Sequence, residues 1–306
     1  MTQGATSYRS TLAASSPSGK SRVNIAPYLF MLPVLLLVSA VSLYPIVDAI
    51  RLSFFSTRYM EVREFIGFEN YLTILDTARG RSNIEHSLVY VFSSLAVLVP
   101  FSLLLASLLN RPVRFRRVFR TLVLIPWVIS QTIAGLLWRW ALDRNYGPFT
   151  DVIYRITGEQ PDVLGFPKSA MAALVIVNVW LNYPYAVILF LAALQTIPRE
   201  LYEAASIDGA SAWVSFRRIT LPLIKPTMMI TAIILTLLFF NMVTLILVFT
   251  GGGPFSATEV LSLRAFKEGF QFFRIGLGAA FSVLIFIINV IFSLSYVKLL
   301  QTDVYT

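Results

Sequence analysis

Six long stretches without a charged side chain run through this chain of 306 residues. Each is close to the ~20 residues that an α-helix needs to cross ~30 Å of hydrocarbon. A transmembrane barrel is excluded because barrel strands alternate polar and apolar residues over ~10 positions, whereas these stretches are apolar on every side. Since hydrocarbon offers the backbone no hydrogen-bond partner, the sequence predicts an all-α integral membrane protein with six transmembrane helices. The expected helices cover residues 25–47, 86–110, 121–138, 169–198, 226–258 and 275–297.

Composition excludes several classes of function. Hydrophobic residues make up 57% and charged residues 13% of the chain, whereas soluble domains are about 45–50% apolar and about 25% charged. The chain has no cysteine and one histidine, so disulfides, thiolate metal sites and histidine relays lack their groups. We therefore expect no catalytic residue, no metal site and no cofactor held by this chain. The formal charge of +9 is typical of cytoplasmic loops in a membrane protein, so we expect no nucleic-acid partner.

The first 24 residues are polar and serine-rich. They predict a disordered cytoplasmic tail before a single transmembrane domain over residues 25–306. Residues 14–21 read A-S-S-P-S-G-K-S and nearly spell a phosphate-binding loop. However, Ala14 replaces the first glycine, and the segment follows no strand, as such a loop would require. We therefore reject a nucleotide site here.

Basic loops indicate the orientation in the membrane. The total of Lys and Arg is nearly equal on the two sides, so this total does not decide. Residues 111–120 contain five arginines and no acid between two expected spans, and short loops of this kind stay in the cytoplasm. We therefore expect both termini of the chain, and the loop at about 199–226, to be cytoplasmic.

A charged segment separates the fourth and fifth expected spans. A helix is expected over residues 199–207, directly after a proline that suits the start of a helix. Asp208-Gly209 predicts a turn, since glycine accepts a left-handed backbone. A second helix over about 210–219 is expected to stop at Leu221-Pro222 and Pro226, which redirect the chain into the membrane. Taken by itself, this amphipathic pattern also fits a helix that only lies on the lipid surface.

The same segment resembles a known family. The spacing from Glu203-Ala204-Ala205 through Gly209 to Leu221-Pro222 is that of the EAA loop in membrane subunits of bacterial ATP-binding-cassette (ABC) importers. Agreement at so many positions is rarely accidental. The resemblance implies the type I ABC importer permease fold and a coupling helix that sits in a groove of an ATP-binding subunit. The residues that it implies for ATPase coupling are Glu203, Ala204, Ala205, Asp208, Gly209, Phe216, Leu221 and Pro222.

The flanking segments resemble the carbohydrate branch of this family, and in particular the first permease subunit of maltose- and glycerol-3-phosphate-type importers. The segments Trp180 to Pro184 and Ala192 to Pro198 carry this likeness. So does a glycine-rich stretch followed by Thr258-Glu259, although composition alone predicts only a loop there. The resemblance implies that this stretch contacts an external binding protein through Gly251, Gly252, Gly253 and Pro254.

Polar side chains inside the spans are the candidates for a sugar pathway. Sugars need hydrogen-bond partners, and polar groups at membrane depth tend to be functional. The alternative is that such side chains only form hydrogen bonds between helices. The predicted pathway residues, all on the fourth and fifth spans, are Asn178, Asn182, Tyr185, Asn241 and Thr244.

The resemblance implies a non-catalytic, multi-pass subunit in the bacterial cytoplasmic (inner) membrane. Its implied partners are a second homologous permease, two subunits that bind ATP and Mg²⁺, and an extracytoplasmic sugar-binding protein. Three alternatives stay open: an importer of this class for a non-sugar solute, a self-sufficient secondary transporter, and a membrane enzyme. A secondary transporter would usually need intramembrane carboxylates, which the central spans lack, and an enzyme would need acid–base groups that are equally scarce.

Overall fold

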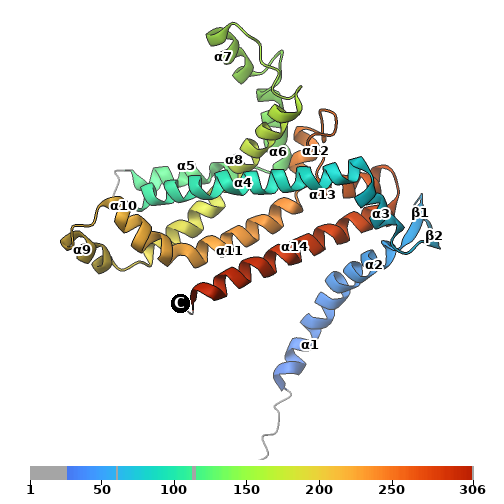
Figure 1. Ribbon diagram of the computed structural model, residues 1–306, viewed down its shortest axis with the longest axis horizontal. Helices are drawn as coiled ribbons and strands as arrows, with labels where there is room; N and C mark the ends of the chain where they lie inside the picture. Colours follow the sequence, from blue (N-terminus) through green and yellow to red (C-terminus); the bar gives the residue numbers. More distant parts are fainter. Residues whose placement is uncertain (1–25, 60, 112–114, 305–306) are drawn as a thin grey trace, which may run out of the picture. The chain divides into compact units, whose positions relative to one another are not determined.

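The computed structural model describes residues 26–59, 61–111 and 115–304, so the tail expected over residues 1–24 lies outside the described residues. The described parts are mainly helical, with one two-stranded sheet. The chain divides into two compact units, residues 1–46 and 47–306, and each is described by itself. Figure 1 shows the elements of both.

A continuous apolar helix forms the described part of the first unit and ends in the second. Its segment from Phe30 to Leu52 is long and apolar enough to cross a membrane. Partway along it, the N–H of Tyr44 donates to the carbonyl of Ser39, one residue farther back than in an α-helix. This wider turn stands directly before Pro45, which has no N–H of its own. The elements are α1 (Ala26–Val38), the π-helical turn η1 (Ser39–Leu43) and α2 (Tyr44–Leu52).

Four long helices form the core of the second unit. α4 (Ala78–Asn110) packs along α8 (Pro167–Gln195), and α11 (Leu221–Phe240) lies against both of them and against α14 (Ile275–Val304) (Figure 1). Aromatic side chains from α4, α8 and α11 are fully buried. Each of the four belongs to a helix that is long and apolar enough to span a membrane. The second, fourth and sixth expected spans overlap α4, α8 and α14, although α4 begins eight residues before the expected span and α14 extends beyond it.

A hairpin and several short helices cover one end of these long helices, named here the hairpin end (Figure 1). The N–H of Gly276, at the start of α14, donates to the Thr57 hydroxyl at 2.8 Å, which holds the hairpin against α14. The sequence analysis predicted no strand here, because the two strands are only four and five residues long. The elements at this end are β1 (Phe55–Arg58), β2 (Glu61–Phe65), α3 (Glu69–Asp76), α13 (Leu261–Phe266) and the π-turn η3 (Lys267–Gln271).

The opposite end carries the charged segment 199–226 and is named the EAA end. α4 and α8 both end there, since Asn110 and Gln195 line one cavity together with Arg120. The elements that follow α8 at this end are α9 (Arg199–Ile207), α10 (Ala212–Ser215) and the π-turn η2 (Phe216–Thr220).

The third expected span is broken, which corrects the prediction of one helix over residues 121–138. Two separate helices, α5 (Arg116–Val128) and α6 (Gln131–Ala141), replace it, and the angle between the axes of their described parts is 94°. Ser130 starts the second helix, because its side-chain oxygen accepts the Ile133 N–H at 3.3 Å, as a helix N-cap does. Within the described residues, five unbroken helices are therefore long enough to span a membrane, or six spans exist if the bent pair is one.

The fifth span begins and ends earlier than the predicted range, residues 226–258. One helix runs from Ala212 to Phe240, and a separate helix, α12 (Thr244–Phe249), follows after a short break. The prediction therefore placed the start of this helix too late at the EAA end. It also joined two helices that the chain separates at Asn241.

Prolines do not end the helix at the EAA end, so the prediction that Leu221-Pro222 and Pro226 stop a short loop helix is wrong. The N–H of Leu221 donates to the carbonyl of Phe216 in the π-turn η2, directly before Pro222. Helices in membranes continue through proline when such local π adjustments satisfy the backbone groups that proline frees. The loop helix and the fifth span are consequently one continuous element.

Gly80, near the start of α4, lies against the backbone of Ile74 on α3, and a Cβ at this position would collide with the Ile74 carbonyl. Gly80→Ala is therefore expected to lower the free energy of unfolding by about 1–3 kcal/mol, as overpacking of a filled site does. The measurement is the thermal unfolding midpoint in detergent. Gly269→Ala serves as control, since a Cβ there meets nothing within 4 Å. Equal midpoints for the two variants would contradict this packing.

Candidate functional site

The EAA segment begins with α9, which ends as the sequence predicts. The Ala210 N–H donates to the Ala205 carbonyl at 2.8 Å, and the Gly209 N–H donates to the Ser206 carbonyl at 3.1 Å. This pair of bonds closes a helix C-terminus when the residue after the cap has a left-handed backbone. Gly209 has φ +75°, which glycine adopts at no steric cost. The expected first helix and the turn after it are therefore confirmed.

One side of α9 is open to solvent. Glu203, Ala204 and Asp208 are exposed, and Ile207 is 87% exposed. Residues three and four apart lie on one face of a helix, so these four form a single surface, named here the docking face. Ala205, which was also predicted to take part in coupling, is half-buried. The docking face is therefore small and acidic apart from one exposed isoleucine.

Tyr202 ties α9 to the start of the fifth span. Its hydroxyl lies 2.8 Å from Thr220 Oγ1, and its ring packs against the hydrophobic core. Phe216 also packs against the core, and its ring centre lies 5.6 Å from that of Trp213. This contact between Tyr202 and Thr220 was not predicted from the sequence, because the two residues are 18 positions apart and no local pattern joins them. The remaining predicted coupling residues, which lie in the first turn of α11, are Leu221 and Pro222.

Two of the five predicted pathway residues are buried between α4 and α8. The Asn178 amide donates to Ser94 Oγ at 3.0 Å, and the Asn182 amide donates to Asn178 Oδ1 at 2.9 Å. In this single chain they form the polar contact between helices that is common in membranes, and their contact with a sugar stays a prediction. Ser94 was missed, because it is one of several serines within this apolar span and no local pattern distinguishes it.

The other three predicted pathway residues lie elsewhere. Asn241 and Thr244 flank the break between α11 and α12, where both are exposed, and the Asn241 amide donates to the Leu237 carbonyl at 2.7 Å. Tyr185 is half-buried, and its ring centre lies 6.0 Å from that of Trp127 on α5. Of the five residues, the contacts join only Asn178 to Asn182 directly. For these three also, contact with a sugar stays a prediction.

The glycine-rich loop closes on itself at the hairpin end. Thr258 Oγ1 donates to the Gly253 carbonyl at 2.8 Å, and the peptide bond between Gly253 and Pro254 is cis. Gly252 has φ +92°, and a Cβ there would press on side chains of α13 and η3. Phe255, which follows Pro254, is 92% exposed. The predicted contact residues therefore belong to a folded turn that presents an aromatic ring to solvent.

A cleft of about 410 Å³ lies beside this loop. Gly253 and Pro254 form part of its wall. Arg139, Asp143 and Arg144, at and after the end of α6, contribute charges of both signs to the same cleft. The loop thus borders a polar recess that the sequence analysis did not predict.

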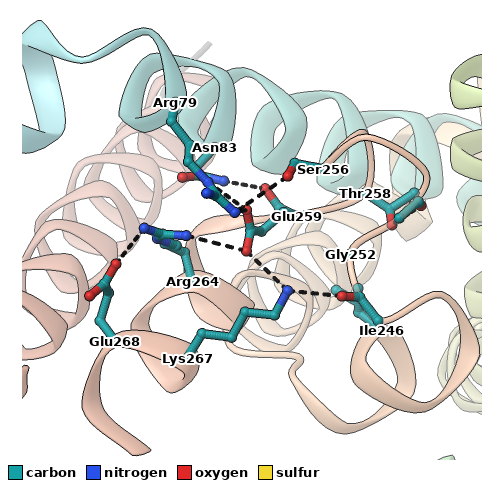
Figure 2. Close-up of polar contacts among 12 residues, drawn as sticks. Arg79, Asn83, Ile246, Gly252, Ser256, Thr258, Glu259, Arg264, Lys267 and Glu268 are labelled. Carbon is teal, nitrogen blue, oxygen red and sulfur yellow. Dashed lines mark hydrogen bonds and ion pairs between the residues drawn. The ribbon is translucent and has the colours of Figure 1, made fainter. Parts of the chain in front are cut away.

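A group of charged side chains, named here the Glu259 cluster, holds the loop in place (Figure 2). Glu259 is fully buried, and its Oε2 accepts from Arg79 Nη2 at 2.9 Å while its Oε1 accepts from Lys267 Nζ at 3.0 Å. Lys267 Nζ also donates to the Gly251 carbonyl at 2.9 Å. The Asn83 amide donates to the Glu259 carbonyl at 2.7 Å. These bonds connect α4, the glycine-rich loop and η3.

A second buried carboxylate completes the cluster. Arg264 lies between the two acids: Nη2 pairs with Glu268, and Nη1 lies 3.6 Å from Glu259 Oε1 (Figure 2). Arg274 Nε contacts Glu268 Oε2 at 2.7 Å. Buried charges are costly unless they are paired in this way. The sequence analysis noted Glu259 only as part of a family-like stretch, because Arg79 stands 180 positions earlier.

The surroundings of the Glu259 carboxyl lower its pKa and so favour its ionised form. Burial by itself raises its pKa, but hydrogen bonds from Arg79 and Lys267 outweigh burial and hold the pKa below the usual 4.5. The ionised form is therefore the one that ties the loop to α4 and η3.

Acid is expected to weaken the fold through Glu259. A carboxyl whose pKa is lowered by folding contributes stability above its unfolded pKa, and this stability is lost as the pH falls through the folded pKa. The thermal unfolding midpoint in detergent should therefore decrease as the pH falls below 4.5. Glu259→Gln should lower the midpoint at neutral pH and flatten its dependence on acid, whereas the exposed Glu159→Gln should change neither. If Glu259→Gln kept the native acid dependence, another group would be responsible.

Comparison with known proteins agrees with the resemblance in the sequence. Residues 98–301 match the family described as binding-protein-dependent transport system inner membrane component. The chain is 35% identical over 273 residues to the trehalose/maltose transport system permease protein MalF of Thermococcus litoralis, with 89% of this chain and 92% of that protein covered. It is 31% identical over 276 residues to the sulfoquinovosyl glycerol transport system permease protein SmoG of Agrobacterium fabrum, with 90% of each covered.

A solved structure shows the same fold. A chain of a bacterial alginate ABC transporter, crystallised in complex with an alginate pentasaccharide-bound periplasmic protein, matches with a TM-score of 0.78 at 23% identity, over 89% of this chain and 92% of that one. The expected importer permease fold is therefore confirmed. The chain belongs to the inner membrane component family of binding-protein-dependent transport systems, whose members are membrane-spanning permease subunits of ABC importers and not enzymes.

Proposed function

We propose that this chain forms, with a second homologous permease, the translocation pathway of an importer for a sugar or oligosaccharide. The observation that carries the proposal is the docking face on α9, which the Tyr202–Thr220 hydrogen bond joins to the fifth span. The named cargoes of the relatives, trehalose or maltose and sulfoquinovosyl glycerol, support the sugar class.

The EAA end is proposed to face the cytoplasm. The arginine-rich stretch 111–120 connects α4 to α5 at this end, and Asn110 and Arg120 line one cavity with Arg199 of α9. Short basic loops stay in the cytoplasm, so the arginines and the docking face favour the same orientation. The glycine-rich loop at the hairpin end would then face the external binding protein.

The ATP-binding subunits and the binding protein would each use a different surface of this chain. Two ATP-binding subunits, which hold ATP and Mg²⁺, would contact the docking faces of this chain and of the homologous permease, with Glu203 and Asp208 available to basic side chains. The binding protein would deliver its sugar at the glycine-rich loop, where Phe255 and the neighbouring cleft are open. A ligand shifts a conformational equilibrium only by its differential affinity for the two states. ATP and the loaded binding protein would both favour the outward-open state.

One long helix, which a hydrogen bond joins to α9, would connect the docking face to the predicted pathway. Ala212 to Phe240 is a continuous run of 29 residues, which is about 43 Å long at about 1.5 Å per residue. Tyr202 fastens α9 near the start of this helix, and Asn241 and Thr244 lie just past its other end. Movement of α9 would therefore displace the break where polar side chains are exposed.

Two matched glycine variants test the coupling role. Gly209→Pro and Gly158→Pro each place proline at φ +75°, which its ring forbids. Gly209→Pro also removes the N–H that donates to the Ser206 carbonyl at the end of α9. Gly158→Pro likewise removes the N–H that donates to the Tyr154 carbonyl. Only Gly209 borders the docking face, since Gly158 ends α7 (Pro148–Thr157).

In the complex co-expressed with its partners, Gly209→Pro is expected to reduce the ATPase stimulation by sugar-loaded binding protein at least tenfold, or to release the ATP-binding subunit. Gly158→Pro is expected to retain both. The measurement is ATP hydrolysis in vesicles with and without loaded binding protein. The same loss in both variants would mean that general instability, and not the docking face, explains the effect. A permease that moves solute without any ATP-binding partner would overturn the proposal itself.

Thr244→Val tests the sugar pathway. It removes one hydroxyl from an exposed side chain at the helix break and keeps its shape. Loss of one hydrogen bond of about 1–1.5 kcal/mol is expected to raise the KM for sugar uptake about tenfold, with ATPase coupling unchanged. The control is Thr231→Val, because the Thr231 hydroxyl donates to the Thr227 carbonyl within its own helix. An unchanged KM for Thr244→Val would remove this residue from the pathway.

A further inference from the structure

Two cavities adjoin at the EAA end, outside the docking face and the predicted sugar pathway. One has a volume of about 380 Å³, and Asn110, Arg120, Gln195 and Arg199 contribute polar groups to its wall. The other has a volume of about 250 Å³ and is lined mainly by aliphatic side chains. Arg120 and Gln195 belong to both walls, so a polar chamber and an apolar chamber share one boundary.

The apolar chamber extends from this boundary toward the middle of the bundle. Its wall includes Val187, Ile188 and Leu191 of α8, which precede Gln195 in the helix. Val187 and Gln195 are eight residues apart in sequence, so at about 1.5 Å per residue the chamber reaches about 12 Å inward. On the facing helix α5, Val123 continues the same wall beyond Arg120. The pair of chambers is therefore polar at the EAA end and aliphatic farther along α5 and α8, the direction that would lead from the membrane surface into its interior.

The polar chamber is basic. Arg120 and Arg199 bring two guanidinium groups to it, and none of the described residues in its wall is acidic. Guanidinium groups bind phosphate oxygens through parallel N–H donors. Basic pockets between transmembrane helices on the cytoplasmic side are suited to lipid head groups.

We infer that the two chambers bind one anionic glycerophospholipid, with its phosphate between Arg120 and Arg199 and part of an acyl chain between α5 and α8. A free phosphate or another small anion would occupy only the basic chamber and would leave the aliphatic one unfilled. A neutral hydrocarbon chain carries no negative charge that could pair with the two arginines. A ligand with both parts, in this order of depth, fits both chambers.

The position of the site gives the lipid a route to the coupling helix. Arg199 begins α9, and Tyr202, which also lines the basic chamber, holds α9 to the fifth span. A bound head group would therefore contact the helix that carries the docking face. Assignment to the cytoplasmic leaflet rests on the proposed function, whereas lipid binding itself does not depend on ATP or sugar.

The test is native mass spectrometry of the intact transporter complex, titrated with phosphatidylglycerol or with phosphatidylcholine of the same chains. The native complex is expected to retain phosphatidylglycerol at least tenfold more tightly. Arg120→Gln with Arg199→Gln should abolish this preference. Arg217→Gln with Arg218→Gln removes the same charge from exposed residues at the same end, and it should keep the preference. Equal loss in both double variants would overturn the site.

A second variant tests the aliphatic chamber without changing charge. Leu191→Trp fills this chamber and should weaken phosphatidylglycerol binding at least severalfold, while both arginines stay. Inorganic phosphate should compete poorly. Full competition by phosphate, together with unchanged binding in Leu191→Trp, would show an anion site without an acyl chain and would overturn the lipid proposal. Lipid retention in a complex that lacks sugar-stimulated ATPase activity would contradict the proposed function but support the lipid site.

Discussion

Backbone groups in hydrocarbon can form hydrogen bonds only with the protein itself, and this constraint governs the fold. It requires helices, and it also decides what happens where proline removes an N–H. In both the first and the fifth span, the N–H of the residue just before a proline donates to the carbonyl five positions earlier. Tyr44 donates to Ser39 in the first span, and Leu221 donates to Phe216 in the fifth. The helix widens for one turn and continues. Because the second of these turns lies between α10 and α11, the part of the EAA segment from Ala212 onward is continuous with the fifth span.

The same constraint separates two kinds of polar contact. Within the bundle, neutral side chains satisfy one another, as Asn178 does with Ser94. Buried full charges are gathered at the hairpin end, where Glu259 is paired with Arg79 and Lys267. Pairing offsets the cost of removing these ions from water only when the geometry is good and the remaining hydrogen bonds are made. The network therefore gives the glycine-rich loop one defined position beside the cleft.

The features predicted correctly from the sequence depend on neighbouring residues. Apolar runs predict spans by length alone, and Asp208-Gly209 predicts its turn because only glycine accepts that backbone easily. The missed features depend on contacts between distant segments. The 94° bend after α5, the Tyr202–Thr220 bond and the partners of Glu259 leave no local pattern. Helix ends at prolines were misplaced because soluble-protein rules for proline do not include the π-turn.

The separation of Arg79 from Glu259 in the sequence has a consequence for biosynthesis. A ribosome makes the chain from its N-terminus. Helix α4, whose first turn contains Arg79, is therefore complete long before Glu259 is made 180 positions later. Until then, Arg79 lacks the Glu259 carboxylate that it binds in the folded protein, and Asn83 lacks the Glu259 backbone carbonyl. Non-local contacts of this kind form late because a long stretch of chain must be ordered first. The pairing of Arg79 with Glu259 therefore forms only after four of the helices long enough to span a membrane have been made, and a chain truncated before Glu259 would lack the carboxylate that Arg79 binds.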